Sequence, residues 1–164
     1  MQLDINHIIK THQSKIYKTC LGFTGDSETA KDLLQEVCVN LWLGLEKFNG
    51  QSTIATWIYR ITVNTCLMYQ RKKKITTVDM ATIQEPKTTD EFTADEPNQD
   101  LQLLQRFITE LPEKERIIMI LYLENLSYEE IAEVIGISIN YIGVKINRIK
   151  KKLTKKFEVA KSRT

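Results

Sequence analysis

Apolar residues recur at steps of three and four along most of this chain, whereas the alternation typical of a half-buried strand is not found. The first such pattern begins near Asp4, and the last ends near Phe157. Steps of three and four place side chains on one face of an α-helix, while a strand alternates its two faces. The chain is therefore predicted to be all-α.

A polar, acidic segment separates two groups of predicted helices. Residues 75–100 contain seven acidic residues against one lysine, together with Pro86 and Pro97. Such a composition is typical of an extended or flexible segment. A length of 164 residues suits one domain or two small ones. We therefore predict two small helical bundles, residues 1–74 and 101–164, joined by an acidic flexible linker over 75–100.

Charge is strongly segregated along the chain, although the net charge is only +2. From Tyr141 to the end there are nine Lys or Arg residues against one Glu, and from Thr53 to Lys74 there are five against none. Exposed charges act over about 8 to 10 Å at ordinary salt, so local charge decides what each module attracts. Both modules are predicted to contact nucleic acid, and the acidic linker is predicted to be repelled by it.

Three helices are predicted in the first module. The second of them, residues 27–48, is expected to bury Leu33, Leu34, Val37, Leu41, Trp42 and Leu45. The third is expected to start after an N-cap at Ser52 or Thr53. Its predicted buried stripe consists of Ile54, Trp57, Ile58, Ile61, Thr65 and Met68.

Residues 127–153 have the layout of a helix-turn-helix. Ser127 and Glu130 form a capping box, Gly136 ends the short helix, and Ser138 caps the next one. On a helical wheel the inward set is Ile139, Ile142, Ile146, Ile149 and Leu153. The residues that face outward or flank that face suit a DNA groove: Asn140, Tyr141, Val144, Lys145, Arg148, Lys151, Lys152 and Lys155. Gly143 either permits close approach to DNA or has a packing role.

No pattern in the sequence is typical of catalysis or of a cofactor or metal site. His7 and His12 do not share a helix face, and the cysteines, Cys20, Cys38 and Cys66, are widely spaced. The chain is therefore not expected to be an enzyme, and all three cysteines are expected to be reduced core residues. The N-terminus lacks the features of a signal peptide, and no run of 18 apolar residues occurs. A cytoplasmic protein without membrane insertion is expected.

Motifs in both modules resemble one bacterial family. Asp32-Leu33-Leu34-Gln35-Glu36-Val37 and Thr56-Trp57-Ile58-Tyr59-Arg60-Ile61 resemble domain 2 of sigma factors. Leu111-Pro112 and Glu115-Arg116, ahead of the helix-turn-helix, resemble domain 4. Two such domains with a short linker are similar to an extracytoplasmic-function (group IV) sigma factor. The resemblance implies a subunit that binds core RNA polymerase and directs it to promoter DNA.

The resemblance also implies roles for individual residues. Those expected to bind the clamp helices of core polymerase are Asp32, Gln35 and Glu36. Those expected to bind and melt the minus-10 element are Gln51, Ser52, Trp57, Arg60, Asn64, Arg71 and Lys72. The minus-35 element is expected to meet Asn140, Tyr141, Val144, Lys145, Arg148, Lys151 and Lys152. Tyr59 is a second aromatic candidate for base stacking. For Trp57 the alternative is a core role, because Trp57 lies on the apolar stripe.

Departures from the family pattern occur at Cys38, where Phe is common, at residues 67–70 and at Gly143. The resemblance implies that the acidic linker enters the polymerase as a nucleic-acid mimic; a solubilising linker is the alternative. It further implies a monomer when free and an anti-sigma factor as partner. The competing functional hypothesis is a stand-alone dimeric helix-turn-helix transcriptional regulator.

Overall fold

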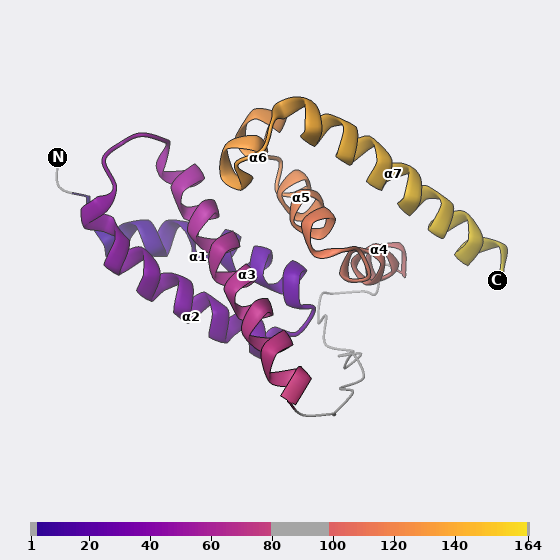
Figure 1. Ribbon diagram of the computed structural model, residues 1–164, viewed down its shortest axis with the longest axis horizontal. Helices are drawn as coiled ribbons and strands as arrows, with labels where there is room; N and C mark the ends of the chain where they lie inside the picture. The colour runs from indigo at the N-terminus through magenta and orange to yellow at the C-terminus, as the bar shows by residue number, and fades with distance from the viewer. Residues whose placement is uncertain (1–2, 80–98, 164) are drawn as a thin grey trace. The chain divides into compact units, whose positions relative to one another are not determined.

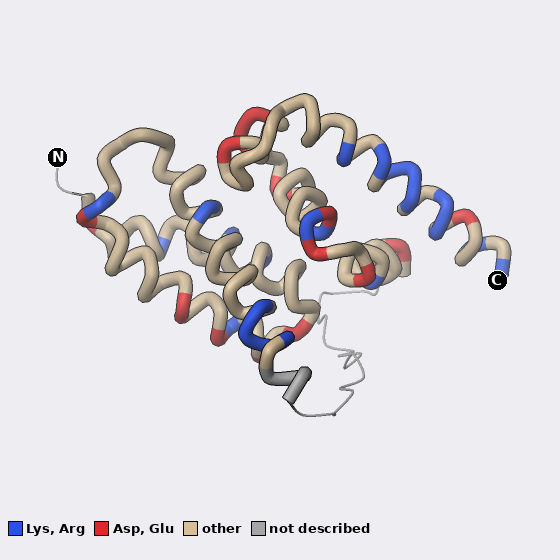
Figure 2. Tube along the Cα trace, viewed as in Figure 1, with Lys and Arg blue, Asp and Glu red and all other residues tan. Residues whose placement is uncertain are grey.

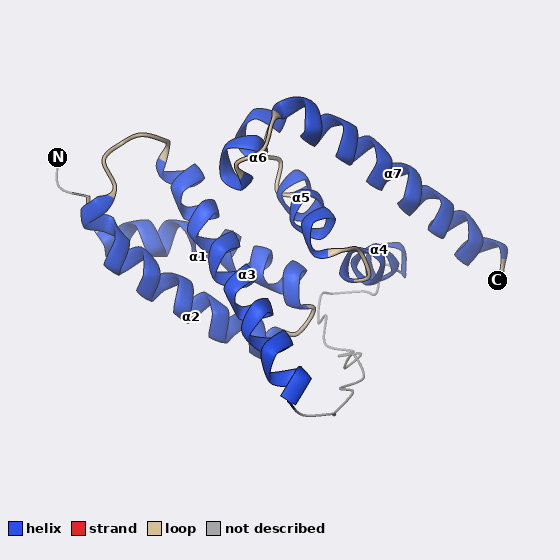
Figure 3. Cartoon of the chain, in the orientation of Figure 1, coloured by secondary structure: helices blue, strands red, loops and turns tan. Residues whose placement is uncertain are grey.

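The chain divides into two compact units, residues 1–92 and 93–164. A computed structural model describes residues 3–79 and 99–163. In these two ranges every regular element is a helix, which confirms the all-α prediction (Figures 1 and 3). Residues 80–98, most of the predicted linker, lie outside the described residues, so a flexible linker stays a prediction there. Its first five residues, 75–79, and its last two, 99–100, lie in described helices. None of the described helices combines the length and apolar character needed to cross a bilayer.

The described part of the first unit, residues 3–79, contains three α-helices and one 3-10 turn. They are α1 (Ile5–Thr24), α2 (Ser27–Gly44), η1 (Leu45–Lys47) and α3 (Ile54–Asp79). Asp4 and Asp26 cap α1 and α2 through carboxylates that accept backbone N–H groups. Of the two predicted caps for α3, it is Thr53 that accepts the N–H of Thr56, at 3.2 Å. These side chains satisfy N–H groups that a helix start otherwise leaves without partners.

The core of the first unit lies where α1, α2 and α3 meet. Its most buried apolar side chains are Ile16, Cys20, Phe23, Leu33, Val37, Leu41, Ile58 and Cys66. The Cys66 thiol donates to the sulfur of Cys20 across a distance of 3.9 Å. This hydrogen bond and burial raise the pKa of Cys66. Cys20 and Cys66 are thus reduced core residues as predicted, whereas Cys38 is only half-buried.

Two residues predicted to be buried in this unit are exposed. Trp42 is 59% exposed, because α2 buries a narrow stripe at Leu33, Val37 and Leu41. Met68 is 55% exposed, since the buried face of α3 includes Thr62, which is fully buried. The Thr62 hydroxyl donates to the carbonyl of Ile58 at 2.8 Å, so its polar group needs no water. The sequence analysis thus placed Ile58 and Thr65 correctly on the buried face of α3, but it left out Thr62 and included Met68.

The second unit contains α4 (Gln99–Thr109), α5 (Glu113–Leu123), α6 (Tyr128–Ile135) and α7 (Ile139–Ser162). The predicted capping box is confirmed: Ser127 N–H donates to the Glu130 carboxylate at 2.9 Å, and Glu130 N–H donates to Ser127 Oγ at 3.1 Å. Gly136 ends α6 with a φ of 82°, which glycine adopts without steric cost. Ser138 then caps α7 by accepting the Tyr141 N–H.

Helix α7 packs against α4, α5 and α6 through one apolar stripe. Ile142, Ile146 and Ile149 are fully buried, and Leu153 is nearly so. Ile139, predicted to belong to this stripe, is 47% exposed. It is the first residue of α7, directly after the turn, where the neighbouring helices leave it uncovered. The inward stripe is therefore confirmed at four of its five positions.

Replacing Ser127 with alanine should destabilise the second unit by about 1 kcal/mol, because the α6 capping box loses its acceptor. Urea unfolding followed by far-UV circular dichroism measures both units. Tryptophan fluorescence follows the first unit alone, since Trp42 and Trp57 are the only tryptophans. The urea midpoint of the fluorescence transition should be the same in Ser127→Ala as in the wild type. The control Ser14→Ala, at an exposed position inside α1, should change neither signal by more than about 0.5 kcal/mol; an equal loss in both variants would contradict the capping role.

Candidate functional site

Helix α7 carries most of the Lys and Arg residues of the second unit, and several of them lie on its outward face. Because the inward stripe is buried, residues half a turn away face solvent: Asn140, Tyr141, Val144, Arg148 and Lys151 are all exposed. Tyr141 and Val144 are 44% and 50% exposed, which leaves apolar area among the polar groups. Figure 2 shows Lys and Arg along the C-terminal half of α7. This face offers hydrogen-bond donors, an apolar contact and positive charge side by side.

Six cations of α7 form two rows with different surroundings. In the paired row, Lys145 and Lys152 lie 3.6 and 3.0 Å from the carboxylate of Glu115 in α5. The same row continues to Lys156, which lies 3.3 Å from Glu110. The outward row consists of Arg148, Lys151 and Lys155. Among the described residues, none of these three has an ion pair.

The sequence analysis grouped Lys145 and Lys152 with Arg148 and Lys151, but the structure separates them into these rows. It also did not identify Glu115 as a neighbour of that face. The sequence signal was weak, because Glu115 lies in the first turn of α5, where acidic residues are ordinary. Only the packing of α5 against α7 brings it to the lysines.

Gly143 lies inside α7, directly before Val144. A Cβ atom built there would lie 3.6 Å from the Tyr128 ring, an ordinary van der Waals distance. Close packing therefore does not require glycine at this position. Near this contact, Lys150 donates to the Tyr122 hydroxyl at 2.6 Å, and this hydrogen bond raises the pKa of Lys150.

One face of α2 presents a continuous strip to solvent. The predicted residues Asp32, Gln35 and Glu36 are all exposed. Three large apolar side chains continue the same face at helical spacing: Val39, Trp42 and Leu43 are 57%, 59% and 69% exposed. The sequence analysis did not name Val39 or Leu43, and it placed Trp42 in the core. We call these six residues the α2 strip. It joins a polar, acidic half to an apolar half, and exposed apolar area of this kind is typical of a protein interface.

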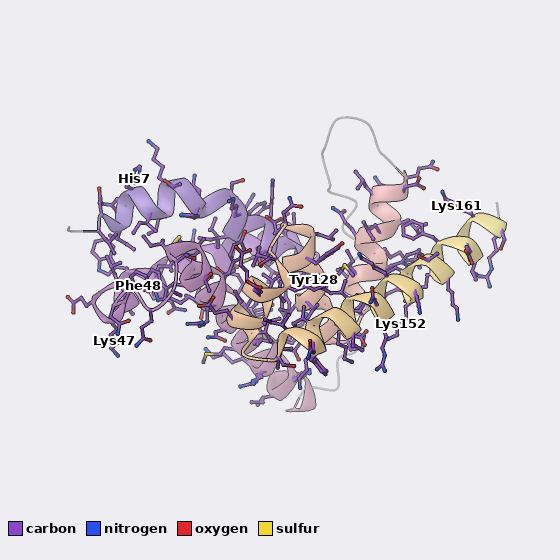
Figure 4. The ribbon with its side chains drawn as sticks, turned by 90° about the horizontal axis from the view of Figure 1, so that it is seen from above. His7, Lys47, Phe48, Tyr128, Lys152 and Lys161 are labelled. Atoms are coloured by element: carbon purple, nitrogen blue, oxygen red, sulfur yellow. The ribbon has the colours of Figure 1, made fainter. Side chains whose placement is uncertain are left out.

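The loop before α3 and the exposed face of α3 form a third surface. Gln51 and Asn64 are exposed, while Ser52, Trp57 and Arg60 are half-buried. The Trp57 ring packs against Phe48 at 5.0 Å, and Figure 4 labels Phe48 beside Lys47 at this end of the unit. A Cβ at Gly44 would touch the same tryptophan at 3.5 Å. Trp57 thus anchors the loop onto the helices.

Arg60, Asn64 and Arg71 lie on one face of α3, within about 40° at 100° per residue. The rise of the helix places Arg71 and Lys72, both exposed, about 16 Å beyond Arg60. Tyr59, the other aromatic candidate of this region, is 7% exposed. Its prediction as a base-stacking residue is wrong, because Tyr59 belongs to the core.

Comparison with known proteins gives matches in both units. The family described as Sigma-70 region 2 matches residues 8–75, and Sigma-70, region 4 matches residues 101–153. RNA polymerase sigma factor YlaC of Bacillus subtilis is 30% identical over 165 residues, which cover 94% of each protein. ECF RNA polymerase sigma factor SigW of the same species is 27% identical over 160 residues, which cover 90% of this chain and 86% of SigW.

A solved structure has the same fold. The sigma factor RpoE from Bartonella quintana, in complex with the anti-sigma factor NepR, superposes with a TM-score of 0.80 and 21% identity. The match covers 94% of this chain and 96% of that one.

Replacing Gly143 with alanine should stabilise the second unit by about 0.5 to 1 kcal/mol, because glycine is costly inside a helix and the added methyl group meets no close contact. The free energy of unfolding in urea, followed by circular dichroism, measures the change. A loss of stability would mean that α7 and Tyr128 pack more tightly than the 3.6 Å distance indicates.

Proposed function

The chain belongs to the extracytoplasmic-function sigma factors, which direct RNA polymerase to promoters, and from this premise we propose how its surfaces divide that work. The α2 strip binds core polymerase, the loop and exposed face of α3 hold minus-10 DNA, and the outward face of α7 reads the minus-35 element. The observation that carries the proposal is the buried stripe of α7, since it turns Arg148 and Lys151 outward. Family membership speaks against the stand-alone dimeric regulator.

Core polymerase binding combines charge with apolar contact. Asp32 and Glu36 lie one turn apart and suit basic groups on the partner. Trp42 supplies the large aromatic side chain that most often dominates the energy of a protein interface. The acidic half then orients the encounter, and the apolar half supplies affinity.

Minus-10 DNA is opened by binding energy, without ATP. Gln51 and Ser52 hydrogen-bond a base turned out of the duplex, while Arg60 and Asn64 hold the separated strand. Trp57 positions the loop through Phe48. Arg71 and Lys72 contact phosphates further along α3. Contacts of this kind have to replace the base stacking of the duplex, which is worth about 1.4 kcal/mol per base-pair step.

Minus-35 DNA is read in the major groove by α7. Asn140 and Arg148 hydrogen-bond base edges or phosphates, and Val144 meets a thymine methyl group. Tyr141 and Lys151 contact the backbone, with Lys145 and Lys152 at the flank of the same face. Phosphate contacts set the register of the helix, and base contacts select the sequence.

The remaining parts of the proposal concern the whole chain. It acts in the cytoplasm as a monomer and catalyses no bond chemistry itself. Its acidic segment, residues 75–100, occupies a positively charged channel of the polymerase as a nucleic-acid mimic. As RpoE of Bartonella quintana was solved with NepR, we infer that an anti-sigma factor also holds this chain inactive.

Transcription in vitro tests this function directly. Purified core polymerase, with and without the chain, is given a genomic fragment library, and the RNA starts are sequenced. The proposal expects starts that need the chain and share elements near minus-35 and minus-10. Starts that are identical without the chain, or a failure of the chain to bind the core enzyme, would overturn it.

Replacing Trp42 with alanine should weaken binding to core polymerase about tenfold or more, since exposed aromatic anchors commonly contribute 2 kcal/mol or more. The affinity is measured by titrating labelled chain with core enzyme. Trp42 is 59% exposed, so folding should be unaffected. Leu3→Ala, an exposed apolar position outside the α2 strip, is the matched control; equal affinities for both variants would contradict the assignment of the strip.

Replacing Asn64 with alanine should weaken holoenzyme binding to a single-stranded minus-10 oligonucleotide about two- to tenfold, the value of one hydrogen bond. Binding to double-stranded minus-35 DNA should stay unchanged. Lys151→Gln should weaken binding to double-stranded minus-35 DNA and leave binding to the single-stranded minus-10 oligonucleotide unchanged. If Asn64→Ala weakened both ligands equally, α3 would not be the single-strand surface.

A further inference from the structure

Glu115 makes a close double contact with the DNA-facing helix. Its carboxylate lies 3.0 Å from the ammonium of Lys152 and 3.6 Å from that of Lys145. The Glu115 side chain is only 12% exposed, while those of Lys145 and Lys152 are 25% and 52% exposed. Lys152 lies midway along α7 (Figure 4). Two cations of the same helix therefore share one poorly hydrated carboxylate.

The spacing of the two lysines explains why one carboxylate reaches both. They lie seven residues apart, which is two turns or about 10.5 Å along α7, on the side toward α5. Both long side chains converge on Glu115, so this pair of lysines and Glu115 together carry one positive charge rather than two. Each lysine already has the kind of oxygen partner that a DNA phosphate would supply.

We propose that Glu115 competes with DNA phosphates for Lys145 and Lys152, so that α7 first meets DNA through the outward row. This inference rests on the proposed function, because it requires α7 to lie on DNA. Glu115 is a positioning residue: it contacts no base, and it acts through the two lysines. Phosphate contacts attract DNA of any sequence, so withholding about one of them lowers non-specific binding while the base-reading residues stay available.

Burial makes the competition effective. A carboxylate that is mostly shielded from water is screened little by salt and holds its partners more firmly than a surface carboxylate does. Either lysine can leave Glu115 without leaving its carboxylate unpaired. When one lysine moves to a phosphate, the other still neutralises Glu115. An isolated charge is therefore not left buried when DNA binds.

Salt dependence of DNA binding by the full chain tests the proposal. The probe is a labelled random-sequence duplex of about 30 base pairs, titrated from about 50 to about 200 mM KCl, with affinity read by fluorescence anisotropy. The proteins are the wild type, Glu115→Gln, Lys152→Gln and the double variant. Each phosphate contact contributes about 0.9 to the slope of log affinity against log salt.

Glu115→Gln should tighten binding about five- to tenfold at 100 mM salt, the effect of about one additional phosphate contact. In the Glu115→Gln background, Lys152→Gln should lower the slope of log affinity against log salt by about 0.9. In the wild type, Lys152→Gln should lower this slope clearly less. A loss of about 0.9 in both backgrounds would mean that Glu115 does not withhold Lys152. No loss in either would mean that Lys152 does not meet DNA. Both results overturn the proposal.

Two controls separate this result from other causes. Glu124→Gln removes the same charge at the other end of α5 and should change affinity less than about twofold. Lys151→Gln should lower the slope by about 0.9 in the wild type. If it does not, α7 is not on DNA, and the minus-35 assignment fails rather than the role of Glu115 alone. Circular dichroism checks that Glu115→Gln is folded; even if it is not, a loss of about 0.9 on Lys152→Gln in the wild type overturns the proposal by itself.

Discussion

The rotation of α7 about its own axis is the constraint on which the proposed DNA-facing surface depends. Ile142, Ile146 and Ile149 are fully buried, and each contributes about 1.5 to 3 kcal/mol relative to exposure. Turning the helix by one residue would expose this stripe and bury lysines. Exposing the stripe and burying lysines would cost too much free energy for the unit to stay folded. The apolar core therefore decides which cations meet solvent. Binding chemistry on α7 is therefore a consequence of its packing.

The first unit follows the same logic with different residues. A narrow buried stripe on α2 leaves the opposite side free to combine acidic and apolar groups in the α2 strip. On α3, buried threonines donate to the carbonyls one turn back, so the helix keeps its core contacts while Arg60, Asn64 and Arg71 share the other face. The three proposed binding surfaces thus arise from the faces that two small cores do not use.

Much of this architecture was predictable, because local rules decide it. The capping box at Ser127, the turn at Gly136 and the inward stripe of α7 each depend on residues close in sequence. The errors at Trp42, Met68 and Ile139 have a different origin: how wide a face is buried depends on the neighbouring helices, not on periodicity. The contact of Glu115 with Lys145 and Lys152 joins residues about 30 or more positions apart and depends on how α5 packs on α7.

The central claim is that α7 and the α2 strip face different partners in one initiation complex. A photo-crosslinking amino acid placed at Val144 or at Val39, both at least half exposed, tests it in the holoenzyme bound to promoter DNA. The account predicts crosslinks from position 144 to upstream promoter DNA and from position 39 to the largest polymerase subunit. Crosslinks from position 144 to protein only, or from position 39 to DNA, would contradict it.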